Sequence, residues 1–380
     1  MVTMLRDPPM ERRLSMERYA DRVRDGVEAS NRYRVEAAAL RSHREGWRWH
    51  FDRLIAYTVN AARRAGDLFH VIDHGFAHLS HWLPPDRTVV TCHDLMALRS
   101  LQGQTGSGSR AVTVARFRWS IGHMRRVAHV MCDSMATRQD VIELVGVPED
   151  RVSTILLGVE ERFHPLGWDA RERVRRRLGL DGKVVIGNVS TGAEYKNPAG
   201  VLHTLRELRD RGVPAVLLRT GRGFAQHHVN LRRELGLDEF VIERGIVDDE
   251  ELVATYNASD VLLHPSYWEG FGWPPLEAMS CGTPVVTSTA PSLLEVTSGA
   301  GLAAQADDHA GLADRVQEAL RPEVAADLRR RGLERADQLR WGPCVDAVLA
   351  VYDATLERAV SPARGRLRSS RKPLTTLRSP

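Results

Sequence analysis

The chain has 380 residues, of which 43% are hydrophobic and 27% charged, an ordinary composition for a globular protein long enough for two domains. The formal net charge is +4, and the basic residues are spread along the chain without a recognisable nucleic-acid-binding motif, so we expect no nucleic-acid partner. The four cysteines lie far apart without a C-x-x-C pair, which argues against a disulfide framework or a structural zinc site.

Short apolar runs rich in β-branched residues recur along the chain, and helical patterns separate them. Continuous apolar strands that alternate with helices indicate parallel sheets covered on both faces. In the first half, strands are predicted at Tyr33–Ala37, Leu68–Ile72, Thr88–Cys92, Val127–Cys132 and Val152–Leu156. In the second half, they are predicted at Lys183–Val189, Ala215–Arg219, Phe240–Glu243, Val261–His264 and Pro284–Thr287. Two such sets predict an α/β chain with two Rossmann-like domains.

The predicted domain boundary lies near Phe163–Gly182, where His164-Pro165-Leu166-Gly167 interrupts the pattern and an Arg-rich helix precedes the next strand. The chain therefore divides into residues 1–164 and residues 165–342. The segment Gly103–Ser109 (GQTGSGS) is typical of a mobile loop. Residues 361–380 are basic, rich in Ser, Pro and Arg and without apolar periodicity, so we expect a disordered tail.

Two common nucleotide-binding motifs are not supported by the sequence. Gly221-Arg222-Gly223 begins like a dinucleotide-binding fingerprint, but Gln226 occupies the third glycine position. The loop Gly103–Ser109 lacks the lysine of a Walker motif and does not directly follow a predicted strand. We therefore expect neither a dinucleotide cofactor nor a phosphate-binding Walker loop.

Four histidines with helix-like spacing suggest a metal site at first sight. Gly75 breaks the run, however, and the first histidine falls in a predicted strand, so these side chains would not share one helical face. We expect a strand-end and loop cluster without a metal, formed by His70, His74, His78 and His81.

The most informative stretch is Val261–Thr287, which reads VLLHPSYWEGFGWPPLEAMSCGTPVVT. A buried strand is followed by a loop at its C-terminal end, where open α/β sheets bind ligands. Two prolines suit the first turn of a short helix and Gly282 suits its end, which places Glu277 in the first turn. Gly270 and Gly272 allow a ligand to approach the backbone closely.

This segment resembles the donor signature of the retaining glycosyltransferases of family 4, which have the two-domain GT-B architecture. The family pattern of two glutamates separated by seven residues is present as Glu269 and Glu277, around an intact Gly270-Phe271-Gly272. The resemblance implies that Glu277 binds the ribose hydroxyls of the nucleotide. It also implies that Glu269 contacts the donor sugar and supports the charge that develops at the anomeric carbon.

A second match follows the strand that ends near Val189, in the segment Ser190–Pro198 (STGAEYKNP). The family places here a lysine that binds the donor diphosphate, and Lys196 fits this role; lysine is rare in the chain and occurs elsewhere only at Lys183 and Lys372. The family also supplies an arginine a few residues earlier, which this chain lacks. Hydroxyls of Ser190 and Thr191, loop amides or Arg219 are the candidates to replace it.

A third match lies at the end of the strand Thr88–Cys92, which continues into His93-Asp94. In the family, this histidine lines the donor-sugar pocket and its backbone carbonyl faces the anomeric carbon. His93 is therefore the candidate, and a strand-end histidine with a structural hydrogen bond is the alternative. The first sixty residues match poorly, because the strand and Gly-rich loop with which the family opens are not evident in MVTMLRD.

The resemblance implies a retaining, metal-independent transfer of a hexose from a nucleotide-diphosphate sugar to an acceptor hydroxyl on a glycan, a lipid or a small molecule. The N-terminal domain would bind the acceptor and the C-terminal domain the donor, with the helix at residues 343–358 crossing back onto the N-terminal domain. No further cofactor is implied. An inactive scaffold that binds a nucleotide sugar or a partner transferase, and a nucleotide-sugar epimerase or hydrolase, remain the alternatives.

The expected location is the cytoplasm. The longest apolar runs fall short of the ~18 residues of a membrane span, and the charged N-terminus lacks the apolar stretch of a signal peptide. Peripheral contact with the inner face of the membrane stays open, because a mildly basic surface attracts anionic lipids.

Overall fold

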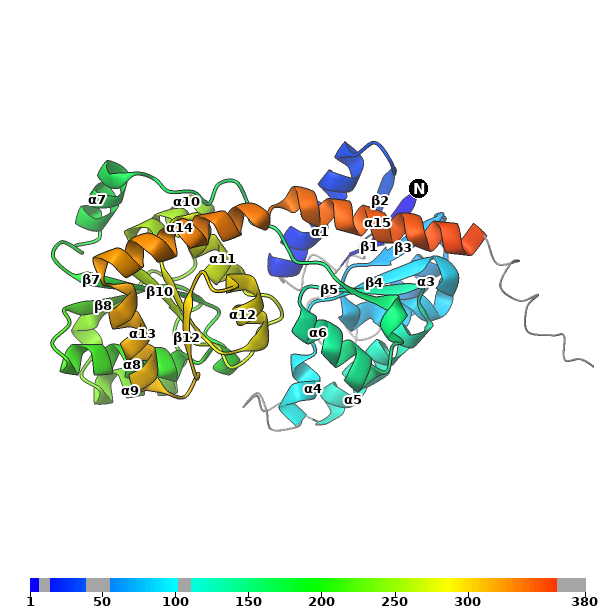
Figure 1. Ribbon diagram of the computed structural model, residues 1–380. Helices are drawn as coiled ribbons and strands as arrows, with labels where there is room; N and C mark the ends of the chain where they lie inside the picture. Colours follow the sequence, from blue (N-terminus) through cyan, green and yellow to red (C-terminus); the bar gives the residue numbers. More distant parts are fainter. Residues whose placement is uncertain (7–13, 39–54, 102–110, 361–380) are drawn as a thin grey trace, which may run out of the picture.

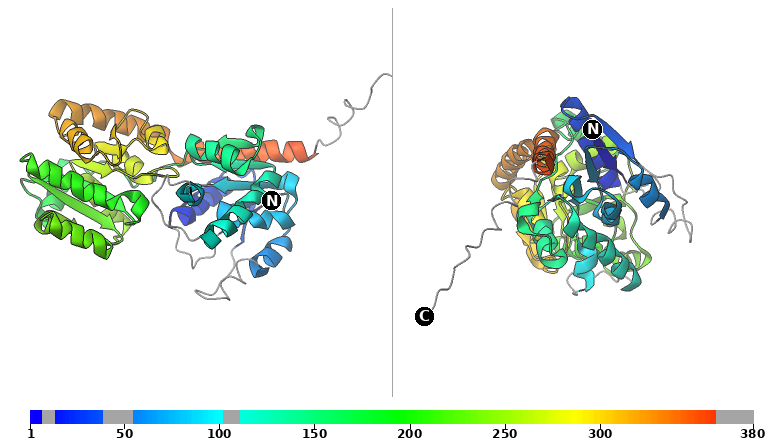
Figure 2. Two further views of the ribbon diagram at one scale, coloured as in Figure 1. Left: turned by 90° about the horizontal axis from the view of Figure 1, so that it is seen from below. Right: turned by 90° about the vertical axis from the view of Figure 1, so that its right-hand side faces the viewer.

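The computed structural model describes residues 1–6, 14–38, 55–101 and 111–360. It contains two α/β domains side by side, and a long pair of helices runs along both of them (Figures 1 and 2). The predicted mobile loop Gly103–Ser109 and the predicted tail 361–380 lie outside the described residues.

The N-terminal domain is built on a six-stranded sheet, and every pairing in it is parallel. The strand order is β2-β1-β3-β4-β5-β6, with β1 Val2–Leu5, β2 Val35–Ala38, β3 Leu68–Val71, β4 Thr88–Cys92, β5 His129–Cys132 and β6 Val152–Thr154. The α-helices of this domain are α1 Leu14–Ala29, α3 Tyr57–Ala62, α4 Met96–Leu101, α5 Ala111–Gly122 and α6 Met135–Asp140.

The C-terminal domain repeats this plan with a second parallel six-stranded sheet. Its order is β12-β11-β10-β7-β8-β9, with β7 Val184–Ser190, β8 Ala215–Gly221, β9 Val241–Glu243, β10 Val261–His264, β11 Val285–Ser288 and β12 Leu302–Ala304. Its helices are α7 Trp168–Arg177, α8 Pro198–Asp210, α9 Gln226–Glu234, α10 Asp249–Ala258, α11 Trp273–Ser280, α12 Pro291–Thr297, α13 His309–Ala319 and α14 Pro322–Gln338. The paired strands β7 and β10 lie at its centre.

The predicted strands each overlap an observed one, and two observed strands were not predicted. The strand β1 lies second in its sheet, between β2 and β3, although MVTMLRD shows no alternation or preceding turn that marks a strand. The family's opening strand is therefore present in this chain. The edge strand β12 has the sequence LAA, and alanine favours helices over strands.

The final helix, α15 Trp341–Val360, returns from the C-terminal domain to the first sheet. It packs beside α1, and both helices cover one face of that sheet (Figure 1). The contact is close, since a Cβ atom added to Gly26 on α1 would lie 2.4 Å from Cγ2 of Val345. The hydroxyl of Tyr352 also lies 2.7 Å from Nδ1 of His70 on β3. The predicted crossing helix 343–358 falls within α15.

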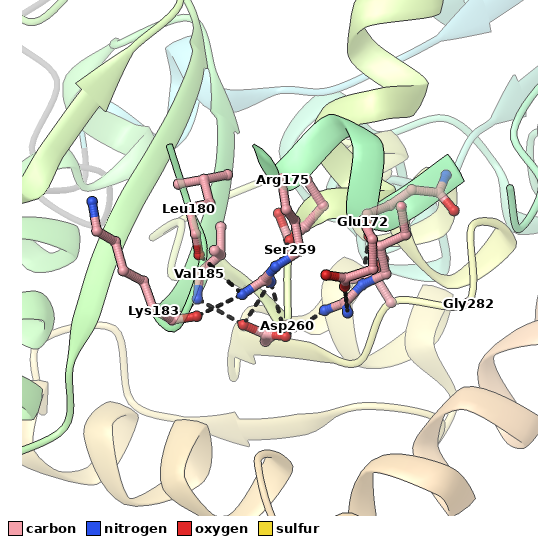
Figure 3. A network of polar contacts seen from close by, with 12 residues as sticks. Glu172, Arg175, Leu180, Lys183, Val185, Ser259, Asp260 and Gly282 are labelled. Carbon is pink, nitrogen blue, oxygen red and sulfur yellow. Dashed lines mark hydrogen bonds and ion pairs between the residues drawn. The ribbon is translucent and has the colours of Figure 1, made fainter. Parts of the chain in front are cut away.

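A network of charged and backbone groups joins α7 to the start of β10 (Figure 3). The carboxylate of Asp260 accepts hydrogen bonds from the guanidinium groups of Arg171 and Arg175 and from the backbone N–H of Val185. Arg175 is buried and also donates to the carbonyls of Ala258 and Lys183, at 2.9 and 2.6 Å. This network lies at the N-terminal ends of β7 and β10, away from the edge where ligands are expected.

None of the described helices combines the length and the apolar character that crossing a bilayer requires.

Candidate functional site

The predicted donor segment lies at the C-terminal end of β10, a central strand of the second sheet. His264 ends the strand, and a loop leads to Gly272, which caps α11 with a φ of 118° that favours glycine. The helix spans Trp273–Ser280, so Glu277 is its fifth residue and lies beyond the first turn, contrary to our prediction. The helix starts one residue before the two prolines, which accounts for the shift.

Lys196 and Glu269 form a buried ion pair at this edge. The ammonium lies 2.6 Å from both carboxylate oxygens of Glu269, whose residue is 7% exposed. Nε2 of His264 and the hydroxyl of Ser266 lie 2.7 and 2.8 Å from Oε1 of the same carboxylate. The loop after β7 and the loop after β10 thus meet at Glu269, although the two charges are far apart in sequence.

The ion pair holds both of its groups in the charged state. Burial would raise the pKa of Glu269, but the Lys196 ammonium and the hydrogen bond from His264 outweigh it and lower the pKa to about 2. Burial disfavours the charged form of Lys196, yet the Glu269 carboxylate raises its pKa above the usual value. Burial lowers the pKa of His264 despite the adjacent carboxylate, so a neutral imidazole donates from Nε2 to Glu269.

Glu277 points into the space between the domains and binds one group from each. Arg18 on α1 donates to its Oε1 at 2.6 Å, and the buried hydroxyl of Tyr256 donates to its Oε2 at 2.6 Å. The Arg18 guanidinium also lies over the ring of Trp273, 5.3 Å from its centroid. The carboxylate expected to bind ribose therefore forms an ion pair between the domains here.

His93 reaches the same region from the N-terminal sheet. Its Nδ1 lies 2.6 Å from Oδ2 of Asp133, and its Nε2 lies 3.0 Å from the carbonyl of Ile72. Its own carbonyl faces Gly270, where an added Cβ atom would lie 2.1 Å from the oxygen. Both ring nitrogens have partners, so the backbone carbonyl and not the imidazole is the group that His93 presents to the other domain.

The remaining predicted residues surround the ion pair. Ser190 ends β7, and its hydroxyl accepts from the N–H of Gly192 at 3.1 Å, whereas Thr191 is exposed. Phe271 is buried in the core between Gly270 and Gly272. The described residues leave Nε and Nη2 of Arg219 without a hydrogen-bond partner, although this side chain is only 1% exposed. Arg219 lies under the turn at Gly192, and a Cβ atom added to this glycine would lie 3.1 Å from its Nη2.

Five further residues complete the site and were not predicted from the sequence, Ser266 of the loop after β10 among them. His264 could have been found, because it is the last residue of the strand whose end carries the loop. Arg18 and Tyr256 could not, since Arg18 lies 259 positions from the glutamate that it contacts. Asp133 could not be found either, because its contact with His93 spans 40 positions.

The four spaced histidines do not converge on one point. Three of them have separate neighbours: His70 contacts Tyr352, His78 contacts Ser120 at 3.0 Å and His81 contacts Arg126 at 3.0 Å. His74 contacts the backbone N–H of His93 at 3.2 Å. His70 lies on β3 as predicted, but the last three lie on the 3-10 helix η2, His74–Trp82, and not in the predicted loop.

Solved structures with the same fold are numerous. Anabaena HepE, solved with UDP and glucose, superposes with a TM-score of 0.74 at 18% identity and covers 93% of this chain and 100% of its own. Sucrose-phosphate synthase from Thermosynechococcus elongatus gives a TM-score of 0.73 at 19% identity and covers 94% and 99%. These likenesses identify the two-domain arrangement as the GT-B fold.

Sequence relatives match both domains. Residues 16–163 match the model of Glycosyltransferase Family 4, and residues 170–338 match that of Glycosyl transferases group 1. O-antigen chain mannosyltransferase B of Escherichia coli is 30% identical over 57% of this chain, which spans 58% of that relative. The D-inositol 3-phosphate glycosyltransferase of Mycolicibacterium smegmatis is 30% identical over 309 residues, or 77% of this chain and 68% of that protein. With both halves matched and the signature glutamates at the carboxyl edge of the second sheet, this chain belongs to the group 1 glycosyltransferases.

Proposed function

We propose that the protein transfers a hexose from a nucleotide-diphosphate sugar to an acceptor hydroxyl, with retention of configuration and without a metal. The observation that carries this proposal is the convergence of Lys196, Glu269 and Glu277 at the carboxyl end of β10, opposite His93 of the N-terminal domain. This is where an open α/β sheet binds its ligand. The names of the relatives, a mannosyltransferase among them, support a hexose as the transferred group.

In this proposal, Lys196 stabilises the departing diphosphate. A lysine with a raised pKa stays charged at neutral pH, and a compact ammonium suits a cluster of phosphate oxygens. The ammonium binds Glu269 in the described structure and can contact a phosphate on its other side, because an ammonium has three donors. The negative charge of Glu269 would then lie beside the sugar ring as positive charge develops there.

His264 and Ser266 act on the reaction through Glu269. Both donate to Oε1, which fixes the direction of the carboxylate and supports its ionised form. A carboxylate held in place before the reaction needs no reorganisation when charge develops. These residues are therefore positioning residues in the proposed mechanism.

A binding protein without transferase activity is the second candidate, and one observation favours it. Arg18 and Tyr256 already occupy both oxygens of Glu277, so a ribose must compete with or displace an interdomain ion pair. In an active enzyme, donor binding would release Arg18 and allow the domains to move. In an inactive scaffold, the pair would persist.

A donor screen followed by a turnover assay separates the two candidates. UDP-, GDP- and ADP-sugars are tested by thermal shift on the full chain, and each donor that stabilises the protein is then tested for release of the nucleoside diphosphate. We expect one nucleotide class to stabilise the protein and to be turned over. Stabilisation without any release, by hydrolysis or transfer, would support a scaffold that binds nucleotide sugar. No stabilisation by any nucleotide sugar would contradict the transferase and support a scaffold in which Arg18 stays bound to Glu277.

A further inference from the structure

A second group of polar side chains lies beside the proposed donor site but takes no part in it. Glu194 is the first residue of the short 3-10 turn η7, Glu194–Lys196, and His227 and His228 lie in the first turn of α9. The ligand atoms of these three side chains lie close enough to share one metal ion. Residues 1–6, 14–38, 55–101 and 111–360 contain no other such group of three or more His, Cys, Asp or Glu side chains.

The three side chains converge, but only one of the two imidazoles forms a hydrogen bond with Glu194. Nε2 of His227 lies 3.0 Å from Oε1 of Glu194, a normal hydrogen bond. Nε2 of His228 lies 3.6 Å from Oε2, which is too long for one. His228 is only 2% exposed, and its Nδ1 has no hydrogen-bond partner among the described residues. A buried imidazole is therefore directed at a carboxylate without bonding to it.

These distances suit a zinc ion between the three groups. Zinc binds imidazole nitrogen and carboxylate oxygen at about 2.0–2.2 Å, so two ligand atoms at a tetrahedral angle lie roughly 3.4 Å apart. The observed separations of 3.0 Å from His227 to Oε1 and 3.6 Å from His228 to Oε2 lie on either side of this value, and the ligand atoms all lie within 4.8 Å of one another. Two imidazoles with one carboxylate form a ligand set that zinc uses with a water molecule in the fourth position. Hard cations such as Mg²⁺ prefer oxygen ligands instead.

The charged neighbours of the group permit a cation. Arg219 is the unfavourable neighbour, but its Nη1 lies 3.5 Å from Oε2 of Glu243, which offsets its charge. His227 and Glu194 are more than half exposed, so an ion can enter from solvent.

We propose that Glu194, His227 and His228 form a zinc site that fastens the η7 turn to the start of α9. The turn carries Lys196 two residues after Glu194, and the carbonyl of Tyr195 between them accepts from the N–H of Tyr267 at 2.8 Å. Zinc would thus fix the outer side of the turn whose inner side forms the Lys196–Glu269 pair. The inference does not depend on transferase activity.

Zinc titration of the whole chain tests the site directly. The protein is prepared without a polyhistidine tag, freed of metal with a chelator, and titrated with Zn²⁺ by calorimetry, with Co²⁺ absorption as a second measurement. The variants are His227→Ala and Glu194→Ala, both at exposed positions that should not affect folding. His203→Ala is the matched control. The ring of His203 stacks on that of His309 with 4.7 Å between the centroids, and the described residues place no third metal-binding side chain beside this pair.

We expect one zinc ion per chain, with binding weakened at least tenfold in His227→Ala and in Glu194→Ala and unchanged in His203→Ala. His228→Ala should also weaken binding in protein that circular dichroism shows to be folded. Zinc binding by His227→Ala with the affinity of the parent, or the absence of one-to-one binding in the parent at 100 μM zinc, would overturn the proposal. Because no donor is present, neither result depends on the proposed transferase function.

Discussion

Two charged clusters lie at opposite ends of β10, and they use their charges differently. Asp260, just before the strand, binds two arginines and a backbone N–H, and Arg175 in turn binds two carbonyls (Figure 3). The carboxylate of Glu269, just after the strand, binds side chains and no backbone group among the described residues, with Lys196, His264 and Ser266 as its partners. The first cluster is tied to the backbone and is part of the scaffold. The second joins side chains of the loops after β7 and β10.

The largest expected effect comes from breaking the scaffold cluster. Asp260→Ala leaves the buried Arg175 without its carboxylate, and removing one partner of a buried ion pair typically costs about 3–5 kcal/mol of unfolding free energy. Urea denaturation measures this loss. The exposed Asp337, 3.6 Å from Arg340, is the control, and Asp337→Ala should change stability by less than about 1 kcal/mol. The donor affinity of the folded Asp260→Ala protein should stay unchanged. A loss of donor affinity without a loss of stability would show that the Asp260 cluster belongs to the binding site and not to the scaffold.

Glu269→Gln should lower turnover far more than donor affinity. An amide keeps the size of the carboxylate but removes the charge beside the ring, which typically costs about 3–4 kcal/mol, or a hundred- to a thousand-fold in rate. Single-turnover rates and donor binding are measured separately.

The variant also leaves Lys196 beside a neutral group, so some loss of stability is expected. Glu251→Gln is the control for this loss of stability, because the substitution weakens ion pairs with Arg177 and Arg244 outside the site. If Glu269→Gln turned over at the wild-type rate, Glu269 would have no role in the reaction. If the loss of donor affinity accounted for the whole fall in turnover, Glu269 would be a binding residue only.

Lys196→Ala should weaken the binding of a nucleoside diphosphate by about 2–3 kcal/mol and that of the nucleoside much less, because charge-assisted contacts to phosphate are lost. The difference should shrink at high salt. Lys183 is the matched control, since it is exposed and its ammonium points away from Asp260 in Figure 3. Equal losses for nucleoside and diphosphate would show that Lys196 is structural.

Glu277→Ala and Arg18→Ala should change nucleotide affinity in opposite directions. Removing Glu277 takes charged hydrogen bonds from the ribose and should cost about 1–3 kcal/mol of binding free energy. Removing Arg18 releases Glu277 from its interdomain partner and should strengthen nucleotide binding by a few fold. Calorimetry with the free nucleotide measures both variants. If Glu277→Ala bound the nucleotide unchanged, the ribose assignment would be wrong.

The smallest expected effect is that of a chelator on turnover. The proposed chemistry rests on Lys196 and Glu269, so excess chelator should change the donor turnover rate by less than about twofold, even though it would remove zinc from Glu194, His227 and His228. A loss of turnover that a divalent ion restores both in the parent and in His227→Ala would contradict the metal-free mechanism, because the variant lacks a ligand of the proposed zinc site.

The sequence predicted the parallel α/β architecture because buried parallel strands are continuous apolar runs between helices, a local pattern. It also placed Lys196 and Glu269 in loops that follow predicted strands, and the pairing of these strands, β7 and β10, is seen in the structure. It did not reveal β1, whose four residues show no alternation, or the contact between Arg18 and Glu277. Such contacts depend on how the two domains meet, and no local spacing in the chain encodes that.

The return of α15 to the first sheet has a consequence for synthesis of the protein. Strands β1 to β6 leave the ribosome first, but the helix that covers one of their faces, residues 341–360, leaves near the end. Domains usually fold in the order in which they are made. Here all strands of the C-terminal domain are synthesised before α15, the last helix of the N-terminal domain. The domain that is translated first is therefore completed last, and a nascent chain shorter than 341 residues leaves uncovered the part of this face that α15 packs against beside α1.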